Sequence, residues 1–437
     1  MGRILSILYY YVRTRFFRRF ASRAQLEAWQ EKQVRRFLRK ILPKSPYYRR
    51  RFFNLPISDW RKLTPIEKSD MMENFSELNT AALLKEECLS VAIQSEETRD
   101  FSPTLQGYTV GLSSGTSGHR GLFLVSSNER WMHAGTMLAK VLPGSLLQPQ
   151  RIAFFLRANS NLYTASKSRH LQFEFFDMLA PMDSHLAQLQ SYQPTLIFAP
   201  PSLLRQLADR QIQGKLNLTP LKVVSVAETL DPLDEQIIQE AFHQKVHQVY
   251  QCTEGFLGIT CSHGKLHLNE DCVHIEKDYL EREAGKFVPI ITDFSRTTQP
   301  IIRYRLNDIL TESKEPCVCG SPLQAIDTIE GRCDDMIDFE SLDGTGTRKI
   351  FPDFIRRCVL FASDQIQEYR IRQFNSGTLE IALQASTGDL SEIQAQIQSE
   401  FNKLATQLKC HPPKISFRDS FETLGLKKLR RVERVHE

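Results

Sequence analysis

The sequence predicts an α/β protein in two parts: a large N-terminal domain built on mixed, largely parallel sheets, and a small C-terminal α+β domain. Three observations support this prediction. The chain has 437 residues, which is more than one compact core accommodates. Strand-like and helix-like patterns alternate between residues 121 and 252. Beyond Ile329–Phe339 the pattern changes to short strands and a helix, a module of about 100 residues.

Each element of the large domain follows from the spacing of its apolar residues. Short continuous apolar runs predict buried strands, and apolar residues three or four positions apart predict helices. Strands are expected at 121–127, 151–158, 195–200, 221–228 and 246–252, and helices at 128–142, 202–213 and 233–244. Because strands and helices alternate, we expect a substantially parallel sheet that binds its ligands at the carboxyl ends of the strands. The small domain should contain strands at 368–374 and 378–385 and a helix at 391–408.

The N-terminal segment is strongly basic. Residues 1–51 contain fifteen Lys and Arg but only Glu27 and Glu31, a balance of +13, so the net charge of +5 leaves −8 for the remaining chain. Apolar and basic residues alternate at helical spacing, which predicts two helices. Such a segment is either a helical cap with solvated arginines, or a surface that contacts an anionic membrane or an acidic partner such as a carrier protein.

Composition excludes several classes of protein. No stretch reaches the roughly 18 uninterrupted apolar residues of a membrane span, and Ile4–Val12 is too short and too rich in tyrosine for a signal peptide. Nine cysteines without secretory features indicate a reducing compartment. We therefore expect a cytoplasmic protein, with residues 1–51 as the segment that would contact the inner face of the membrane. No nucleic-acid recognition module is present, so a nucleic-acid partner is not expected.

Three stretches carry residues suited to nucleotide chemistry. Gly111–Arg120 is rich in Ser, Thr and Gly, and such a loop before a strand offers backbone N–H groups and hydroxyls to phosphates. It lacks the spacing of a Walker loop, and a flexible surface loop would use similar residues. The stretch Tyr250–Gly258 places Thr253 and Glu254 at a strand end, and the stretch ITDFSRTTQPIIRYRLND contains Arg303, Arg305 and Asp308. A plain turn and an exposed ion pair are the alternative interpretations of these two stretches.

The order of the motifs is more specific than any one of them. SSGTSG, VAE, YQCTEG, RYRLND, EGRCDD and GLKKLRRV occur in this order between Gly111 and the C-terminus. The series resembles that of the adenylate-forming superfamily, which comprises acyl- and aryl-CoA ligases, luciferases and peptide-synthetase adenylation domains. Within it, FFLRANSNLY, YQCTEGFLG and TDFSRTTQPIIRYRLND resemble the phenylacetate–CoA ligase-like branch, and most closely the synthetases that join AMP to a deazaflavin coenzyme.

The resemblance implies a set of ATP and Mg²⁺ contacts. The phosphate-binding loop would be Ser113, Ser114, Gly115, Thr116, Ser117 and Gly118. Adenine would lie among Ala227, Glu228 and Tyr250. Thr253 would contact the α-phosphate and Glu254 would hold Mg²⁺, while Asp308 would bind the ribose and Arg305 would face phosphate.

The resemblance also implies a mobile small domain. Asp334 would be the hinge, and Lys428 would bridge the carboxylate and the α-phosphate, with Lys427 as its competitor one position earlier. The expected boundaries are 1–52 for the basic helical segment, 53–331 for the large domain, 332–336 for the hinge and 337–437 for the small domain. The chain departs from the family where Arg120-Gly121 replaces the usual loop ending of proline and lysine, so the phosphate-gripping lysine is missing; Arg120 would have to compensate, or the loop would close differently.

Four residues are candidates for a structural zinc site. Cys261-x₅-His267 and Cys317-x-Cys319 supply three thiols and one imidazole, a set suited to tetrahedral zinc. His263 and Cys272 are alternative ligands, and reduced thiols without metal are the other interpretation. The phenylacetate ligase-like branch has such a site in the corresponding segment.

The implied activity is ATP-dependent adenylation of an aryl or fatty acyl carboxylate, followed by transfer to a thiol, amine or hydroxyl, with coenzyme A or a carrier protein as candidate acceptors. Phe155, Asn159 and Tyr163 are expected to line the carboxylate pocket, although phenylalanine there suits a core equally well. The alternatives are AMP transfer to a deazaflavin-like hydroxyl and a catalytically degenerate scaffold protein. The oligomeric state is left open.

Overall fold

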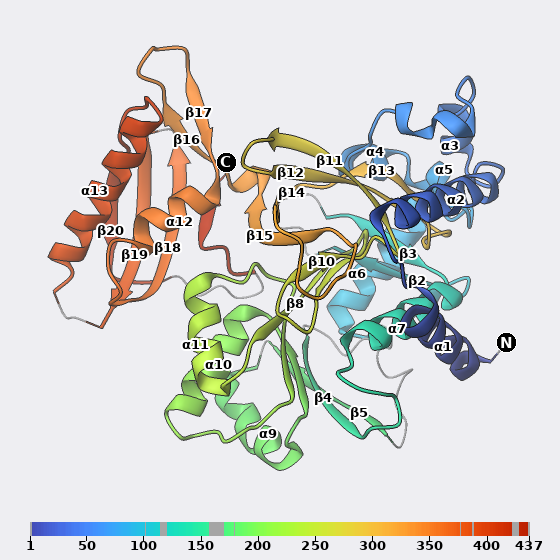
Figure 1. Cartoon of the computed structure of the whole chain (residues 1–437), viewed down its shortest axis with the longest axis horizontal. Coiled ribbons are helices and arrows are strands. Elements are labelled where there is room, and N and C mark those ends of the chain that lie inside the picture. The colour runs from blue at the N-terminus through green and yellow to red at the C-terminus, as the bar shows by residue number, and fades with distance from the viewer. Residues whose placement is uncertain are drawn as a thin grey trace. The chain divides into compact units, whose positions relative to one another are not determined.

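We analysed a computed structural model of the chain, which describes all residues except 1, 101, 114–119, 157–169, 179, 376, 387–388, 422–427 and 436–437. The chain divides into two compact units. Unit 1 contains Met1–Leu230, Asp234–Leu306 and Glu312–Asp327; unit 2 contains Asp231–Leu233, Asn307–Thr311 and Thr328–Glu437. Figure 1 shows the helices and strands of the chain.

The basic N-terminal segment is helical, as its periodicity predicts. It forms α1 (Arg3–Val12), the π-turn η1 (Arg13–Phe17), α2 (Arg23–Ile41) and α3 (Pro46–Arg51). The Ser22 hydroxyl caps α2 by accepting a hydrogen bond from the Gln25 amide, and Ser45 caps α3 in the same way. Leu26, Val34 and Leu38 are buried along one side of α2, so this helix packs against the body of unit 1. Among the described residues, no helix combines the length and apolar composition needed to cross a bilayer.

A small three-stranded antiparallel sheet follows. The elements before it are η2 (Ile57–Lys62), α4 (Lys68–Glu73), α5 (Phe75–Leu78) and α6 (Lys85–Thr98), and the strands are β1 (Thr104–Leu105), β2 (Tyr108–Leu112) and β3 (Leu122–Val125). Val110, Leu122 and Leu124 pack with residues of α5 and α6 to form its core. The loop from Ser113 to Gly121 therefore connects two paired antiparallel strands.

A twelve-stranded sheet forms the centre of the fold, with the order β11-β12-β14-β15-β10-β9-β8-β7-β6-β4-β5 and β13 paired to β12. Its strands are β4 (Gln150–Leu156), β5 (Leu171–Asp177), β6 (Leu196–Ala199), β7 (Lys222–Val226), β8 (Val246–Cys252), β9 (Gly255–Thr260), β10 (Leu266–Leu268), β11 (His274–Glu281), β12 (Lys286–Asp293), β13 (Ile301–Arg305), β14 (Asp308–Glu312) and β15 (Ala325–Arg332). Strands β4 to β8 pair in parallel, whereas β8 with β9 and β9 with β10 pair antiparallel.

Helices cover both faces of the parallel strands. They are α7 (Ser127–Val141), α9 (Leu186–Tyr192) after η3 (Met182–His185), α10 (Pro201–Ile212) and α11 (Pro232–Phe242). Neighbouring residues of β4 show the two faces: Phe155 packs in the core with α9 and α10, whereas Phe154 packs in the core with α1 and α7. Because both faces of each parallel strand are buried, the sequences of these strands are continuous apolar runs. The predicted mixed, largely parallel α/β fold is confirmed (Figure 1).

Unit 2 is a small α+β unit, as the change of pattern after Phe339 predicts. It contains η4 (Cys333–Asp335), β16 (Ile337–Glu340), β17 (Thr347–Ile350), α12 (Pro352–Leu360), β18 (Ile366–Asn375), β19 (Thr378–Ala385), α13 (Ser391–Gln407), β20 (Lys414–Arg418) and β21 (Val432–Arg434). The strand order is β20-β19-β18-β21, with β16 and β17 as a separate pair. Ile371, Ile381, Ile397 and Phe401 form the centre of its core.

Candidate functional site

The base of the Ser/Thr/Gly loop is closed by a reciprocal pair of hydrogen bonds. The Ser113 amide donates to the Gly121 carbonyl (2.7 Å), and the Gly121 amide donates to Ser113 Oγ (2.8 Å). Ser114 to Gly118, the rest of the expected phosphate loop, lie outside the described residues. Two residues before Ser113, Gly111 is paired with Phe123, and a Cβ at Gly111 would lie 2.4 Å from the Phe123 ring. A larger residue at position 111 would therefore have to displace the Phe123 ring.

A lysine from a distant helix reaches the base of this loop. Lys68, the first residue of α4, donates from Nζ to Ser113 Oγ (3.3 Å). Gly121 makes room for it, because a Cβ at Gly121 would lie 2.9 Å from Lys68 Cε. The backbone of Ile66 anchors the segment by pairing with Arg303 and Arg305 of β13. Lys68 was not identified from the sequence, since nothing local marks a lysine 45 residues before the loop.

Among the described residues, Arg120 contacts the loop backbone and a neighbouring helix rather than a loop hydroxyl. Its Nε donates to the Ser113 carbonyl (3.2 Å), and its guanidinium forms an ion pair with Glu96 of α6. Arg120 thus braces the outside of the loop against α6. In the part of the loop that is described, Lys68 is the cation that contacts a loop hydroxyl.

Thr253 and Glu254 form the turn between β8 and β9. Thr253 Oγ1 donates to Glu254 Oε2 (2.8 Å), and the buried Tyr304 hydroxyl donates to Glu254 Oε1 (3.2 Å). Arg296 Nη1 donates to the Thr253 carbonyl (2.8 Å). The turn therefore presents a hydroxyl and an oriented carboxylate, both oxygen donors of the kind that Mg²⁺ prefers.

The loop between β12 and β13 contacts both this turn, through Arg296, and β3, the strand that follows the expected phosphate loop, through Gln299. We call β3 the phosphate-loop strand. Glu129 of α7 is buried and accepts hydrogen bonds from the Thr298 amide (2.8 Å) and hydroxyl (2.5 Å). Burial alone would raise the pKa of Glu129, but the charge of Arg296 and the hydrogen bonds from Ser126 and Thr298 outweigh it, so the pKa is lowered. Gln299 accepts from the Leu124 amide and donates to the Leu122 carbonyl of β3.

This loop was visible in the sequence only as part of the motif TDFSRTTQP. The individual roles of Arg296 and Gln299, and the pairing of the loop with Glu129, were not predicted. The spacing Ser126-x-x-Glu129, which is typical of a capping box at a helix start, is the sequence signal that could have indicated Glu129.

The expected adenine-binding residues lie at the ends of adjacent strands. The register of β7 and β8 pairs Val226 with Val249, so Ala227 and Tyr250 follow at the same edge of the sheet. Ala227 is exposed and has φ +70°, and the Glu228 amide donates back to the Val226 carbonyl (2.9 Å). A non-glycine residue in this tight turn is strained, which is typical of binding sites. Glu228 Oε2 accepts a long hydrogen bond from the Ser202 amide of α10 (3.4 Å).

The expected ribose and phosphate residues fall in different units. Arg305, in unit 1, donates to Asp278 (2.8 Å) and lies 3.8 Å from Glu67, so two carboxylates already balance its charge. Asp308, in unit 2, lies 3.7 Å from Arg332.

The expected hinge and catalytic lysine belong to unit 2. Asn307 Nδ2 donates to Asp334 Oδ2 (2.5 Å), and the neighbouring Asp335 is buried in an ion pair with Arg430 (2.6 Å). Lys428 is half-buried two residues before Arg430, so this ion pair ties its segment to the hinge. Lys427 lies outside the described residues.

The expected substrate-pocket residues are only partly described. Phe155 is 1% exposed and stacks on Phe176, with ring centroids 5.0 Å apart, inside the core of unit 1. This position favours the core interpretation of Phe155 over the pocket interpretation. Asn159 and Tyr163 lie outside the described residues.

The four candidate metal ligands converge. The ligand atoms of Cys261, His267, Cys317 and Cys319 all lie within 4.8 Å of one another. Cys261 Sγ is 3.8 Å from Cys317 Sγ, and Cys319 Sγ is 3.4 Å from His267 Nε2. The alternative ligand Cys272 instead accepts a hydrogen bond from Arg18 and is not part of the cluster. The other alternative, His263, is likewise not a member of it.

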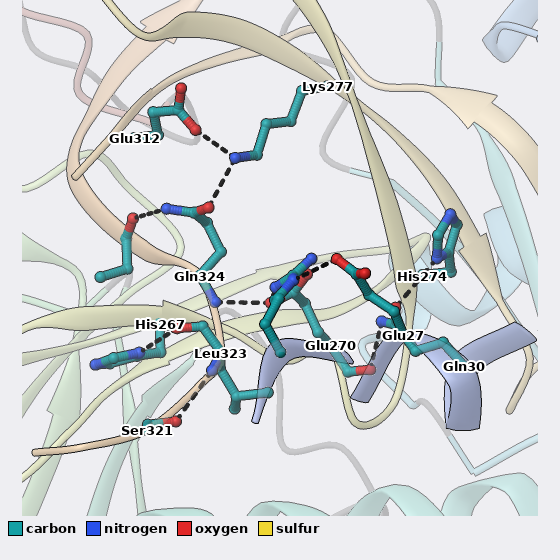
Figure 2. Close-up of polar contacts among 12 residues, drawn as sticks. Glu27, Gln30, His267, Glu270, His274, Lys277, Glu312, Ser321, Leu323 and Gln324 are labelled. Carbon is teal, nitrogen blue, oxygen red and sulfur yellow. Dashed lines mark hydrogen bonds and ion pairs between the residues drawn. The ribbon is translucent and has the colours of Figure 1, made fainter. Parts of the chain in front are cut away.

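The environment of His267 suits a metal ligand. Its Nδ1 lies 3.0 Å from the Leu323 carbonyl, an acceptor that fixes the proton on Nδ1 and leaves the Nε2 lone pair facing the thiols. Burial lowers the pKa of His267, which favours the neutral imidazole. Figure 2 shows that Gln324, the residue after Leu323, continues the network to Glu270. The Gln324 amide donates to Glu270 (2.7 Å), and Glu270 also forms an ion pair with Arg23 of α2 (2.6 Å). The cluster thus lies in a polar framework that includes the N-terminal helices.

Comparisons with known proteins agree with this architecture. No family model matches the chain. The chain is 21% identical over 411 residues to the phenylacetate-coenzyme A ligase of Thermus thermophilus, which covers 86% of this chain and 85% of that protein. It is 29% identical over 141 residues to the indoleacetate–lysine synthetase of Pseudomonas savastanoi, covering 31% of this chain and 34% of that protein.

A solved structure extends the likeness to nearly the whole chain. The 2-hydroxyisobutyryl-CoA ligase in its postadenylation state superposes with a TM-score of 0.66 at 17% identity, covering 93% of this chain and 89% of that one. At this identity the likeness concerns the fold. The likeness to the phenylacetate-coenzyme A ligase and to this fold agrees with the resemblance of the ordered motifs to the adenylate-forming superfamily and its phenylacetate–CoA ligase-like branch.

Proposed function

We propose that the protein is an ATP-dependent ligase that adenylates a carboxylate and then transfers the acyl group to a nucleophile. The observation that carries the proposal is the Thr253–Glu254 turn, which Arg296 and Tyr304 orient and which the Glu129 and Gln299 contacts join to the phosphate-loop strand. An isolated strand turn would not need a buried network of this kind.

In the adenylation step, a carboxylate oxygen of the substrate forms a bond to the α-phosphorus of ATP while the bond from that phosphorus to the bridging oxygen of pyrophosphate breaks. Both reactants are anions, so the protein must offset their repulsion. Lys68 would supply positive charge at the base of the loop, and Thr253 would donate to the α-phosphate. Glu254 would hold Mg²⁺, which when bound neutralises phosphate charge.

Unit 2 would supply the remaining groups. Lys428 would lie between the carboxylate and the α-phosphate, and Asp308 would accept hydrogen bonds from the ribose hydroxyls. Rotation of unit 2 about Asp334 would then withdraw Lys428 and admit the acceptor. The ion pair between Arg430 and Asp335 supports this assignment, because it makes the lysine segment follow the hinge.

The Cys₃His cluster would hold a structural Zn²⁺. Three thiols and a neutral imidazole with an oriented Nε2 fit a closed tetrahedral site. With four protein ligands the ion would leave no position for substrate, so it would brace the turn at Cys261 and the loop from Cys317 to Gln324.

The substrate class proposed is an aryl or fatty acyl acid. Candidate acceptors are the thiol of coenzyme A or of a carrier protein, and an amine. The names of the relatives support both: one is a ligase for coenzyme A and the other joins indoleacetate to lysine.

The test is ATP–pyrophosphate exchange with Mg²⁺ and a panel of aryl acids, fatty acids and a hydroxylated deazaflavin analogue. We expect exchange with one class of acid, and its loss in Glu254→Gln and Lys428→Ala but not in the control Glu283→Gln, which changes an exposed carboxylate. Exchange with the deazaflavin analogue alone would replace carboxylate adenylation by AMP transfer to a hydroxyl. ATP binding without exchange in any case would support the scaffold interpretation.

A further inference from the structure

The first helix of the chain is apolar on two sides. On its inner side, Ile7 and Tyr11 are buried against α7. The two helices cross closely at Gly135, where a Cβ would lie 2.4 Å from the Ile7 carbonyl oxygen. The helix α1 is therefore part of the core of unit 1, and it packs on α7 through its inner side.

The outer side of α1 has no such partner in the described part of the chain. Ile4, Leu5, Leu8 and Tyr9 share one side of the helix, since residues three and four positions apart lie on the same face. All four are exposed, and so are Phe16 and Phe17 immediately after the helix, with Phe17 76% exposed. We call these six residues the apolar arc. Six large apolar side chains within 14 residues of sequence are more than scattered surface exposure explains.

Eleven of the fifteen basic residues between positions 1 and 51 fall into two groups. Arg15, Arg18 and Arg23 point inward, donating to the Ala139 carbonyl (3.0 Å), Cys272 Sγ (3.2 Å) and Glu270 (2.6 Å). The second group, which we call the exposed cations, is exposed and has no carboxylate within ion-pair distance among the described residues: Arg3, Arg19, Lys32, Arg36, Arg39, Lys40, Lys44 and Arg49. The inward arginines fix the segment to unit 1, and the exposed cations do not contribute to that packing.

We propose that the apolar arc and the exposed cations form a docking surface for an anionic lipid bilayer. Apolar and aromatic side chains flanked by arginines suit the boundary between headgroups and acyl chains, and the cations are attracted to anionic headgroups. Arg3 precedes the arc and Arg19 follows it. An acidic protein would match the cations equally well, but it would need pockets for six protruding apolar side chains, whereas a bilayer accepts them in any arrangement.

The charge of the rest of the chain favours one orientation. Residues 1–51 carry +13 and the remaining residues carry −8, from the total of +5. An anionic surface therefore attracts the N-terminal segment and repels the rest. The docking is independent of the adenylation proposed above, although a bilayer-bound ligase would meet fatty acids where they partition.

The experiment is co-sedimentation of the full-length protein with vesicles of phosphatidylcholine alone, or of phosphatidylcholine with phosphatidylglycerol. We expect binding to the anionic vesicles that falls at high salt, and weak binding to the neutral ones. The double variant Phe16→Ala/Phe17→Ala should bind the anionic vesicles about tenfold more weakly. The triple variant Arg36→Gln/Arg39→Gln/Lys40→Gln should lose most of the preference for anionic lipid.

The matched control is Phe361→Ala, which removes from unit 2 a phenylalanine with an exposure (73%) close to that of Phe17 and should leave binding unchanged. Because the altered residues are exposed, all variants should keep the far-ultraviolet circular dichroism spectrum of the parent. Absence of vesicle binding, or an equal loss in Phe361→Ala, would overturn the proposal. It would also be overturned if the parent formed oligomers that Phe16→Ala/Phe17→Ala abolishes while vesicles had no effect, since the arc would then bind a second copy of the chain.

Discussion

Substitution of Lys68 by alanine is the most informative perturbation of the proposed phosphate site. Lys68 Nζ lies 3.3 Å from Ser113 Oγ at the base of the loop, and Gly121 leaves space for its side chain. A unit charge about 4 Å from a phosphate charge contributes about 4 kcal/mol at an effective dielectric constant of about 20. Lys68 is half-buried, so solvent screens part of this interaction.

Loss of one such electrostatic contact costs about 3 kcal/mol in a preorganised site, which corresponds to about 10²-fold in kcat/KM. We therefore expect Lys68→Ala to lower kcat/KM for ATP about a hundredfold in the pyrophosphate exchange assay. Gly121→Ala keeps the charge but would place a Cβ 2.9 Å from Lys68 Cε, so it should displace the lysine and give an intermediate loss.

Lys62→Ala is the matched control, because Lys62 is exposed and paired with Asp59 on η2. Arg120→Ala should cost less than Lys68→Ala, since the Arg120 guanidinium is engaged by Glu96. The reasoning would be refuted if Arg120→Ala lost about a hundredfold while Lys68→Ala stayed within about threefold of the parent. Arg120 would then be the residue that grips phosphate.

Three further predictions concern metal, packing and pH. The purified protein should contain one zinc per chain by metal analysis, and Cys317→Ser should lose it and lower Tm by about 6 °C, whereas the buried control Cys358→Ser should keep its zinc. Glu129→Gln should lower the free energy of unfolding by about 3 kcal/mol in urea titration, because it leaves the charge of Arg296 poorly compensated. Burial lowers the pKa of His133 to about 4 and that of His274 to about 3, so stability should fall between about pH 6.5 and 4, by up to about 1.4 kcal/mol per pH unit for each histidine.

The direction of the pH effect follows from proton uptake. In the unfolded chain both histidines take up protons below about pH 6.5, whereas in the folded chain they stay neutral to lower pH. Their contribution is therefore complete above the unfolded pKa and is lost as pH falls. Glu129, whose folded pKa is also depressed, acts in the same direction below its own unfolded pKa. A flat stability profile between pH 7 and 5 would contradict the burial of His133 and His274. Unchanged zinc content in Cys317→Ser, or a urea midpoint for Glu129→Gln equal to that of the parent, would contradict the other two predictions.

Periodicity and motif order in the sequence were sufficient for the architecture. The apolar runs of β4, β6 and β7 predict a sheet covered on both faces, because successive side chains of a strand point to opposite faces and here both kinds are apolar. The change of pattern after Phe339 predicts the small α+β unit for the same reason. The spacing of cysteines and His267 was enough to nominate the four residues that the fold brings together, because few other combinations supply a tetrahedral ligand set.

The tertiary structure alone decided which residues surround the proposed phosphate and metal sites. Lys68 contacts Ser113 across 45 residues and Glu129 contacts Thr298 across 169, and no local pattern encodes such separations. By its type and position Arg120 could replace the loop lysine, and only the structure shows its ion pair with Glu96 of α6. Phe155 could line a pocket or a core by its type, and only the packing of Phe176 against it separates the two. Local preferences act over a few residues, whereas charge and packing partners are chosen by how the elements meet in space, which a single sequence does not specify.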